Sequence, residues 1–482
     1  MPKARKGRKQ LSEKIIKVNN SLTGRLQPLV SGSKPISIYV CGVTVYDYSH
    51  IGHARTIIVF DVFRRYLLHK GYKILFVQNF TDVDDKIINR ARELGIPPSQ
   101  LAEKFTNQYF SDFDNLNVLR ADFHPKPTEH IAEIQGLIAG LIQKGFAYQT
   151  ASGVYFDVSK FDGYGKLSKK STAELIAGAR VEVDPTKKDP VDFALWKVSE
   201  DEPNWDSSWG RGRPGWHIEC SAMSLKYLGE TFDVHGGGQD LIFPHHENEI
   251  AQSEAYTAKD FVRIWMHVGL VNIGGARMAK SLRNYFPVHE ALRKWGPNII
   301  RLYAVLSHYR SPLEFTEEAF DRKAQLWRLI ENALAELQSS MNARKAGGRK
   351  LRSIAHAAYR EFDDAMKGDL NTPAAVGALM KLVKFVNKTA SMGKLTYQAS
   401  KPVSEVLDKM MWVFGLQIPS VTAEEKEEVE RLVEERNQLR RLKKFSEADK
   451  VRETLRKRGI ELVDYQNRTV WRKTAVLSNQ TS

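Results

Sequence analysis

Apolar and polar positions recur along the chain with two different periods, and the change of period divides it. The run Ile36-Ser-Ile-Tyr-Val40 predicts a short strand. Residues 53–70 carry apolar side chains at a spacing near 3.6 and predict a helix that ends at Gly71. Residues 72–79 predict a second strand. A strand, a helix and a strand in about 45 residues indicate a βαβ unit, whose ligands lie beyond the carboxyl ends of the strands.

The pattern becomes less regular from about residue 120 to 210, where glycines and prolines interrupt it. We interpret this region as an insertion. Strand signals return over 232–240, and a helix is expected to begin at Pro244, since proline suits a first helical position. The sheet of the first region therefore resumes after the insertion.

Beyond about residue 318 the helical period dominates, which predicts a helical bundle. Residues 424–458 form a second, highly charged amphipathic region, followed by short apolar runs at 460–462 and 469–471. Its apolar positions are expected to face inward: Leu432, Leu439, Leu442, Phe445, Val451 and Leu455. This pattern predicts a small, separate C-terminal module.

Composition narrows the class of protein. A chain of 482 residues exceeds one ordinary core, and no apolar run approaches the roughly 18 residues that a membrane span needs. The two cysteines are far apart in sequence, which favours a reducing, cytoplasmic location. The first ten residues are basic and lack the apolar core of a secretory signal. We expect them to form a solvated tail, with an auxiliary RNA contact as the alternative.

The charge balance suggests a class of partner without naming one. Lys and Arg total 72 against 57 for Asp and Glu, a net charge of +15. A basic surface favours a polyanion, because neutralising phosphates releases counterions. A basic but merely soluble surface would show the same balance, so the motifs must decide.

Two short motifs predict a nucleotide site. His50-Ile-Gly-His53 places two imidazoles at a turn that enters a helix, where both can face a phosphate beside the helix N-terminus. Arg277-Met-Ala-Lys-Ser281 follows two glycines and forms a basic loop able to place Lys280 on a triphosphate. Each motif alone is also compatible with an ordinary turn. Together they predict ATP binding and stabilisation of charge on the α-phosphate.

A third group of residues predicts a metal site. Cys220, His245 and Glu249 offer thiolate, imidazole and carboxylate, and Cys41 can complete a tetrahedral set. His245 and Glu249 are four positions apart and so share one helix face. Their neighbours His246 and Glu247 are expected to point off that face. The alternative is that the two cysteines are inert apolar residues.

Longer blocks indicate a family. The order and spacing of the histidine turn and the lysine loop resemble those of class I aminoacyl-tRNA synthetases. Four blocks are similar to those of the cysteinyl-tRNA synthetase family: Cys41-Gly-Val-Thr-Val-Tyr-Asp-Tyr-Ser-His-Ile-Gly-His53, Thr81-Asp-Val-Asp-Asp-Lys-Ile-Ile88, Gly215-Trp-His-Ile-Glu-Cys-Ser-Ala-Met223 and His235-Gly-Gly-Gly-Gln-Asp-Leu-Ile-Phe-Pro-His-His-Glu-Asn-Glu249. The resemblance extends from about residue 20 to 474.

The resemblance implies an architecture. It consists of a Rossmann-like α/β catalytic domain with an insertion, then an α-helical bundle and a small C-terminal anticodon-binding module. We expect a basic tail over 1–20, catalytic halves over 21–120 and 213–317, the insertion over 121–212, the bundle over 318–418 and the module over 419–482. The bundle contains Asp369-Leu-Asn-Thr-Pro373, which is similar to a motif of the family.

It also implies roles for individual residues. One Zn²⁺ per subunit would lie on Cys41, Cys220, His245 and Glu249, and would select the thiolate of cysteine over the hydroxyl of serine. The expected catalytic residues are His50, His53 and Lys280. ATP, with its Mg²⁺, would contact these three and Asp240, Arg277, Met278 and Ser281. Substrate cysteine would meet Gly42, Thr44, Thr81 and Trp216, and tRNA(Cys) would meet Arg440, Asp449, Asp464 and Trp471.

The expected activity is therefore ATP-dependent formation of cysteinyl-adenylate and transfer of cysteine to tRNA(Cys) by a monomer in the cytoplasm. One alternative is a cysteine ligase of mycothiol synthesis, which shares the catalytic fold and zinc site. That relative lacks a C-terminal anticodon module, so residues 424–474 argue against it. The other alternative, an inactive tRNA-binding homologue, is opposed by the presence of His50, His53 and Lys280 together.

Overall fold

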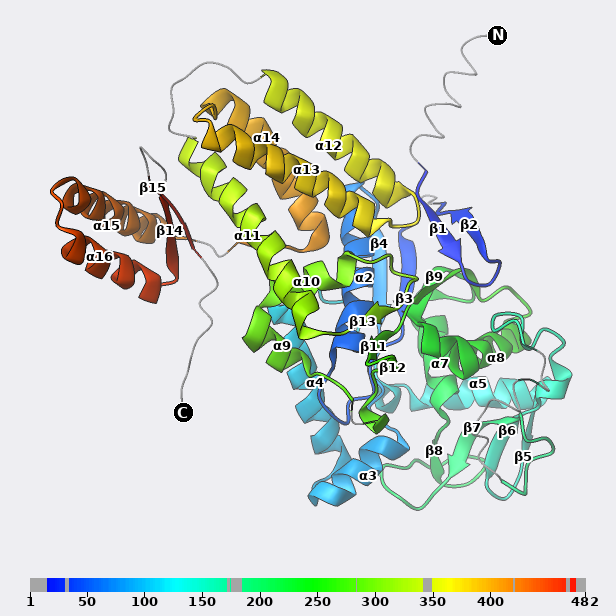
Figure 1. Cartoon of the computed structure of the whole chain (residues 1–482). Helices are drawn as coiled ribbons and strands as arrows, with labels where there is room; N and C mark the ends of the chain where they lie inside the picture. The colour runs from blue at the N-terminus through cyan, green and yellow to red at the C-terminus, as the bar shows by residue number, and fades with distance from the viewer. Residues whose placement is uncertain are drawn as a thin grey trace, which may run out of the picture.

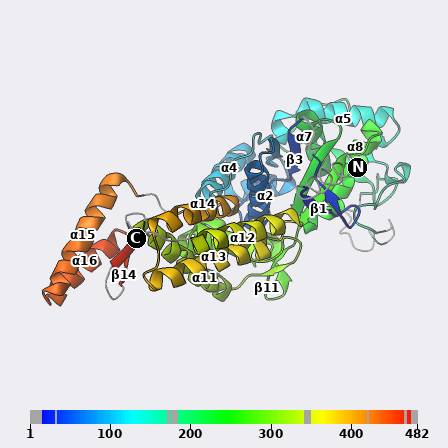
Figure 2. The same cartoon turned by 90° about the horizontal axis from the view of Figure 1, so that it is seen from above.

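The computed structural model describes residues 15–30, 34–170, 174, 184–282, 284–340, 349–418, 421–464 and 469–473. Most of the basic tail, residues 1–14, therefore lies outside the described part. In Figure 1 and Figure 2 the small C-terminal module projects from one end of the molecule, and helix α5 of the insertion (Ile131–Gln143) lies toward the other. The catalytic domain and the helical bundle lie between them.

The catalytic domain is built on a four-stranded parallel sheet in the order β10-β9-β3-β4. Its strands are β3 (Ile36–Val40), β4 (Ile74–Gln78), β9 (Phe232–Gly238) and β10 (Val262–Val268). Helix α2 (Ile51–His69) makes the crossover from β3 to β4 and is buried along most of its length. The predicted βαβ unit is confirmed, and the sheet resumes at β9 as expected.

The remaining elements of this domain surround the sheet. The N-terminal hairpin consists of β1 (Lys17–Asn20) and β2 (Arg25–Pro28). The helices are α3 (Asp85–Leu94), α4 (Pro98–Asn115), α7 (Trp216–Leu228), α8 (Glu247–Thr257), α9 (Val288–Trp295) and α10 (Pro297–Val305). A small sheet, in the order β12-β11-β13, holds β11 (Val271–Ile273), β12 (Ala276–Arg277) and β13 (Leu313–Glu314).

The start of α8 corrects one prediction. The helix expected to begin at Pro244 begins at Glu247, and Ile242–His246 forms a separate π-helical turn before it. Phe243 is extended there, with φ −138° and ψ 135°. Proline disfavours the helical conformation at the residue before it, which accounts for the extended Phe243, whereas Pro244 to His246 have helical backbone angles that continue into α8.

The irregular region after residue 120 folds as helix α5 against an antiparallel sheet in the order β5-β6-β7-β8. Its strands are β5 (Ala147–Gln149), β6 (Gly153–Phe156), β7 (Phe193–Val198) and β8 (Gly212–Pro214). They enclose their own apolar core around Trp196 and Phe156, both of which are fully buried. The insertion is thus a folded unit attached to the catalytic sheet.

Four helices form the bundle: α11 (Glu317–Ser340), α12 (Arg349–Lys367), α13 (Thr372–Ser391) and α14 (Tyr397–Phe414). Buried polar side chains join it to the catalytic domain. Arg301 donates to the carbonyl oxygens of Phe414 at 2.6 Å and of Leu116 at 3.0 Å. Asp369 accepts from the Tyr309 hydroxyl at 2.7 Å and from Arg310 Nε at 3.0 Å. The bundle and the catalytic domain are therefore firmly connected.

The C-terminal module contains α15 (Ala423–Arg441), α16 (Phe445–Lys457), β14 (Ile460–Asp464) and β15 (Thr469–Lys473). Two of its predicted core positions are wrong: Leu442 and Phe445 are 69% and 59% exposed. They fall at the turn where α15 ends and α16 begins, so the helical period that placed them inward does not extend through them. The expected fold class, an α/β catalytic domain followed by a bundle and a small module, is confirmed.

None of the helices in the described ranges has the length and apolar content that a membrane crossing requires.

Candidate active site and metal centre

The four predicted metal ligands converge from four separate elements. Cys41 follows β3, Cys220 lies on α7, His245 lies in the π-helical turn, and Glu249 lies in the first turn of α8. One donor atom from each lies within 4.8 Å of the others, and all four side chains belong to one cluster. The parallel sheet accounts for the placement of Cys41, because its carboxyl edge is where α7 and α8 begin.

The spacing of these donors suits a tetrahedral ion. Cys41 Sγ is 3.9 Å from Cys220 Sγ and 3.6 Å from Glu249 Oε1. His245 Nε2 is 3.0 Å from the same carboxylate oxygen. Bonds of 2.0 to 2.3 Å to a tetrahedral Zn²⁺ place its ligands roughly 3.3 to 3.8 Å apart. Two thiols, an imidazole and a carboxylate at these distances fit zinc with small adjustments.

The two cysteines are free and have unequal acidity. Their sulfurs lie too far apart for a disulfide, whose S–S length is about 2.0 Å. Burial raises the pKa of the Cys41 thiol, whereas a hydrogen bond from Cys41 lowers the pKa of Cys220 to about 6. Cys220 is therefore the more acidic of the two thiols, and the thiolate is the form that binds metal.

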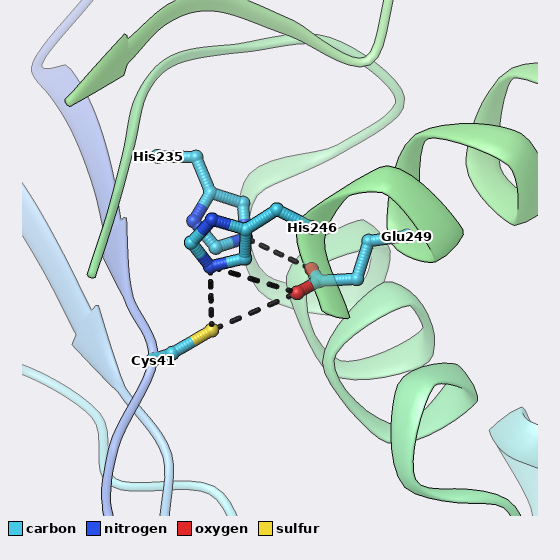
Figure 3. Close-up of side chains that lie close together, drawn as sticks. All are labelled: Cys41, His235, His246 and Glu249. Carbon is cyan, nitrogen blue, oxygen red and sulfur yellow. Dashed lines mark hydrogen bonds and ion pairs between the residues drawn. The ribbon is translucent and has the colours of Figure 1, made fainter. Parts of the chain in front are cut away.

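A second donor set overlaps the first and corrects a prediction about His246. Figure 3 shows Cys41, His235, His246 and Glu249 pointing toward one another. His246 Nε2 lies 3.3 Å from Cys41 Sγ and 4.0 Å from Glu249 Oε1. His246 therefore does not point away from the face that carries Glu249. The reason is that positions three apart share a helix face just as positions four apart do.

Residues outside the four predicted ligands contact them and hold them in place. His235 Nε2 lies 2.8 Å from the second oxygen of Glu249, and His217 Nδ1 lies 3.0 Å from His245 Nδ1. The Trp216 ring stacks on His245 at 4.5 Å between ring centroids. Such partners fix the orientation of ligating side chains. The sequence showed His235 and His217 within the family blocks, but gave no signal of these contacts.

Glu247, the other expected non-ligand, does point away. Its carboxylate accepts from the backbone N–H groups of Gly165, Leu167 and Ser168, at distances from 2.7 to 3.3 Å. It therefore ties the insertion to α8 and is not available to a metal.

Hydrogen bonds from backbone N–H groups hold both imidazoles of the histidine turn in place. His50 caps α2: its Nδ1 accepts from the N–H groups of Gly52 at 3.1 Å and His53 at 3.4 Å. His53 Nδ1 accepts from the His50 N–H at 3.2 Å, and the two rings stack with centroids 3.7 Å apart. Burial lowers the pKa of His50 to about 3 and that of His53 well below its usual value. Both imidazoles are therefore neutral, and each carries its proton on Nε2.

The lysine loop follows a tight hairpin. Gly274 and Gly275 connect β11 to β12 with φ of 58° and 77°, a conformation that glycine adopts without strain. Asn284 then braces the loop: its side chain accepts from the Ala279 N–H and donates to the Arg277 carbonyl, both at 2.9 Å. The sequence placed Asn284 beside the loop but did not predict this role.

Lys280 lines the same cavity as the histidine turn. Its Nζ donates to the Asp47 carbonyl oxygen at 3.0 Å and lies 4.4 Å from the centre of the Tyr46 ring. Burial lowers the pKa of Lys280 to about 8. Arg277 forms an ion pair of 2.6 Å with Asp240, which joins two residues expected to contact ATP. The Ser281 side chain lies outside the described part.

One cavity of about 320 Å³ unites the expected sites. It is lined by Cys41, Gly42, Thr44, His50, His53, Trp216, Asp240, Arg277, Met278 and Lys280, among others. Gly42 is required at its wall, because an added Cβ would lie 1.5 Å from the Asn79 carbonyl oxygen. Thr81 pairs with Thr44 by a β-bridge and is buried behind the lining. Cys41 of the metal cluster therefore lines the same cavity as the histidine turn and Lys280.

The residues expected to contact tRNA do not form one surface. Asp464 accepts from Arg440 at 3.0 Å, and the buried Arg436 binds both of its oxygens at 2.8 and 2.7 Å. Asp449 is exposed on α16. Trp471 instead lines a cavity between the module and α11. Arg440 and Asp464 therefore contact each other, whereas Trp471 lies at the boundary with α11.

Comparison with known proteins agrees with this geometry. Residues 28–325 match the family described as the tRNA synthetases class I (C) catalytic domain, and residues 361–418 match the DALR domain. The cysteine–tRNA ligase of Carboxydothermus hydrogenoformans is 46% identical over 95% of this chain and 100% of its own length. That of Pyrococcus abyssi is 48% identical over 96% and 99%.

Solved structures support the fold. A Mycobacterium tuberculosis methionyl-tRNA synthetase bound by methionyl-adenylate superimposes with a TM-score of 0.59 at 13% identity, covering 79% of this chain and 91% of its own. A leucyl-tRNA synthetase (LeuRS) complex from Agrobacterium radiobacter gives 0.58 at 12% identity, covering 80% and 84%. At such identities the likeness concerns the fold alone. The near-complete match to curated relatives decides the family, and this chain belongs to the cysteine–tRNA ligase family of class I aminoacyl-tRNA synthetases.

Proposed function

We propose that this protein activates L-cysteine with ATP and transfers it to tRNA(Cys). One observation carries the proposal: Cys41, a member of a donor set suited to a thiolate-binding metal, lines the cavity that also holds the histidine turn and Lys280. A thiol and a triphosphate bound there would be neighbours. The membership of the family and the residues of the cavity support the same reaction.

The metal end of the cavity would select the amino acid. Cys41, Cys220, His245 and Glu249 would hold one Zn²⁺, and the ion, when bound, supplies a soft acceptor that favours a thiolate over a hydroxyl. Shape alone separates such similar substrates by only about 10- to 200-fold. Trp216 and Gly42, which line the same cavity, would contact the substrate.

The opposite end would hold ATP. The Nε2–H groups of His50 and His53 are free of the helix cap and would donate to the phosphates. Lys280 would leave the Asp47 carbonyl and place its charge on the triphosphate, which Mg²⁺ accompanies. The cysteine carboxylate then attacks the α-phosphorus, the bond to the β-phosphate oxygen breaks, and pyrophosphate leaves. The residues position the reactants and stabilise charge, and no side chain acts as nucleophile.

A ribose hydroxyl at the 3′ end of the tRNA would then attack the carbonyl carbon of the adenylate and release AMP. The C-terminal module would bind the anticodon. Its tip, residues 440–445, combines Arg440, Arg441, Lys443 and Lys444 with the exposed Leu442 and Phe445. Basic side chains beside an exposed aromatic ring are suited to unstacked loop nucleotides.

A charging assay tests the proposal directly. Purified protein is incubated with ATP, labelled cysteine or serine, and a tRNA(Cys) transcript or a transcript of another tRNA. The proposal predicts cysteinyl-tRNA on tRNA(Cys) alone. Charging with serine at a comparable rate would contradict the metal selection, and no charging by zinc-loaded protein would contradict the proposed reaction.

A further inference from the structure

A single buried arginine lies where the C-terminal module meets the bundle. Arg472 of β15 donates from Nη1 to Asn332 Oδ1 at 2.7 Å and to the Arg328 carbonyl oxygen at 3.2 Å. It also forms an ion pair of 3.4 Å with Glu331, and the side chains are only 8% and 7% exposed. All three partners lie on α11, so these contacts cross from the module to the bundle.

The same guanidinium is held from within the module. Its Nε donates to Glu461 Oε2 on β14 at 2.9 Å. Arginine presents its donors in a rigid planar fork, so fixing one edge of the group fixes the direction of the other. Arg472 therefore transmits the orientation of the β14–β15 hairpin to α11.

The boundary between α11 and the module is not closely packed throughout. A cavity of about 340 Å³ lies between α11 and the module, lined by Gln338 and Ser339 on one side and by Asn437, Arg441 and Trp471 on the other. Interfaces of this kind allow relative domain motion unless they are large and apolar. A buried, directional ion pair beside a cavity is therefore well placed to set the angle of the module.

Helix α11 connects this point to the catalytic domain. It has 24 residues, and its N-terminal part packs there, with Phe320 stacked on Trp295 at 4.4 Å between ring centroids. A helix of this length spans about 36 Å as a stiff rod. Helix α11 therefore joins the module, through Arg472, to the domain that contains the active-site cavity.

We propose that Arg472 is a positioning residue that fixes the anticodon module relative to the catalytic cavity, so that one tRNA is held at both ends at once. The inference rests on the proposed function. When a tRNA is bound at two places on a rigid protein, the first contact raises the effective concentration for the second and so increases affinity. A loosely attached module loses this increase. Arg472 itself is buried and does not contact the RNA.

The test uses the full-length, zinc-loaded protein with Arg472→Met and Arg472→Lys. Cysteine-dependent pyrophosphate exchange needs no tRNA and is expected to stay within about twofold of the unaltered protein, since additivity holds for distant sites. Charging is expected to lose about tenfold or more in kcat/KM for tRNA with Arg472→Met, mainly through KM. Arg472→Lys keeps the charge but not the fork, and is expected to lose an intermediate amount.

Two matched variants separate positioning from other effects. Arg458→Met removes the same charge from the same module, where Arg458 forms an exposed ion pair with Glu428 at 2.7 Å. It is expected to charge almost normally. Asn332→Ala removes a partner of Arg472 on α11 without altering the module, and is expected to reproduce part of the loss. It also serves if Arg472→Met does not fold.

A base change in the anticodon of the tRNA distinguishes a loss of positioning from a general structural defect. A general defect would not alter the loss of charging that the base change causes. In the unaltered protein the change lowers charging, and with Arg472→Met this penalty is expected to shrink, because the module no longer engages the anticodon while the 3′ end is bound. Normal charging by Arg472→Met and Asn332→Ala, an equal loss with Arg458→Met, or an unchanged anticodon penalty would overturn the inference. Failure of the unaltered protein to charge tRNA would instead overturn the proposed function.

Discussion

The active-site cavity and the C-terminal module are built in opposite ways. In the cavity and the metal cluster beside it, side chains from distant parts of the chain are buried against one another, since Cys41 lies 3.9 Å from Cys220 and 3.3 Å from His246. In the module, the residues expected to contact RNA lie within 32 positions of one another in sequence, and its tip is exposed.

The difference reflects what each region would recognise. A small amino acid and a phosphate require donors fixed to within a fraction of an ångström, which burial and mutual hydrogen bonds provide. An RNA loop is large and adaptable, so exposed side chains suffice once the module is held at the correct angle. The variants below test whether the two regions respond separately, beginning with the largest expected effect.

Cys220→Ala is expected to abolish the metal site. The change removes the thiolate that supplies one of four donors, so zinc content should fall to background and cysteine-dependent exchange should disappear. Losing a residue that only hydrogen-bonds to a ligand usually costs less, roughly 10- to 100-fold. Zinc content is measured by atomic absorption. Ser224→Ala alters another buried residue of α7 and should retain both properties. Full zinc content in Cys220→Ala would refute the donor set.

Lys280→Met is expected to lower the kcat of exchange by about 100- to 1,000-fold, the usual cost of removing one group that stabilises developing charge. Zinc content should stay normal, which separates the two ends of the cavity. Arg277→Met removes an exposed, ion-paired charge in the same loop and should cost less. Equal losses in the two variants would contradict the assignment of Lys280.

Phe445→Ala addresses the module. Base stacking on an aromatic side chain contributes about 1 to 3 kcal/mol, so charging should fall by about five- to 150-fold while exchange remains unchanged. Leu442→Ala removes a comparably exposed apolar side chain of the same tip and should have a smaller effect. Loss of exchange in Phe445→Ala would show that the regions are not separate.

The smallest predicted effect is a pH dependence. Burial lowers the pKa of Lys280 to about 8, so the amine is charged below that pH and increasingly neutral above it. Phosphate binding favours the charged form, and KM for ATP should therefore rise by up to about tenfold between pH 7 and pH 9. Lys280→Met should show a flat profile over the same range. A rise that persists in this variant would assign the titration to another group.

The sequence predicted the catalytic fold well because local signals and long blocks agreed. The strand before Cys41, the helix after His53 and the return of the sheet at Phe232 are all in place. The four metal donors were predicted as a set and lie together. Residue type and helical spacing suggested this set, and the resemblance to the family decided it against two inert cysteines.

What the sequence could not provide depends on packing between distant segments. The approach of His246 to Cys41, 205 positions earlier, is one such contact. The exposure of Phe445 follows from a break between two helices that a single period had joined. Arg472 carried no signal at all, because its partners on α11 lie about 140 positions earlier.

The central claim is that the cavity joins thiolate selection to adenylate chemistry, and amino-acid-dependent pyrophosphate–ATP exchange tests it most directly. All standard amino acids are assayed with zinc-loaded protein and again after chelation. The account predicts exchange with cysteine alone, lost on chelation and restored by zinc. Absence of exchange with cysteine, or exchange with serine at a comparable rate, would contradict it.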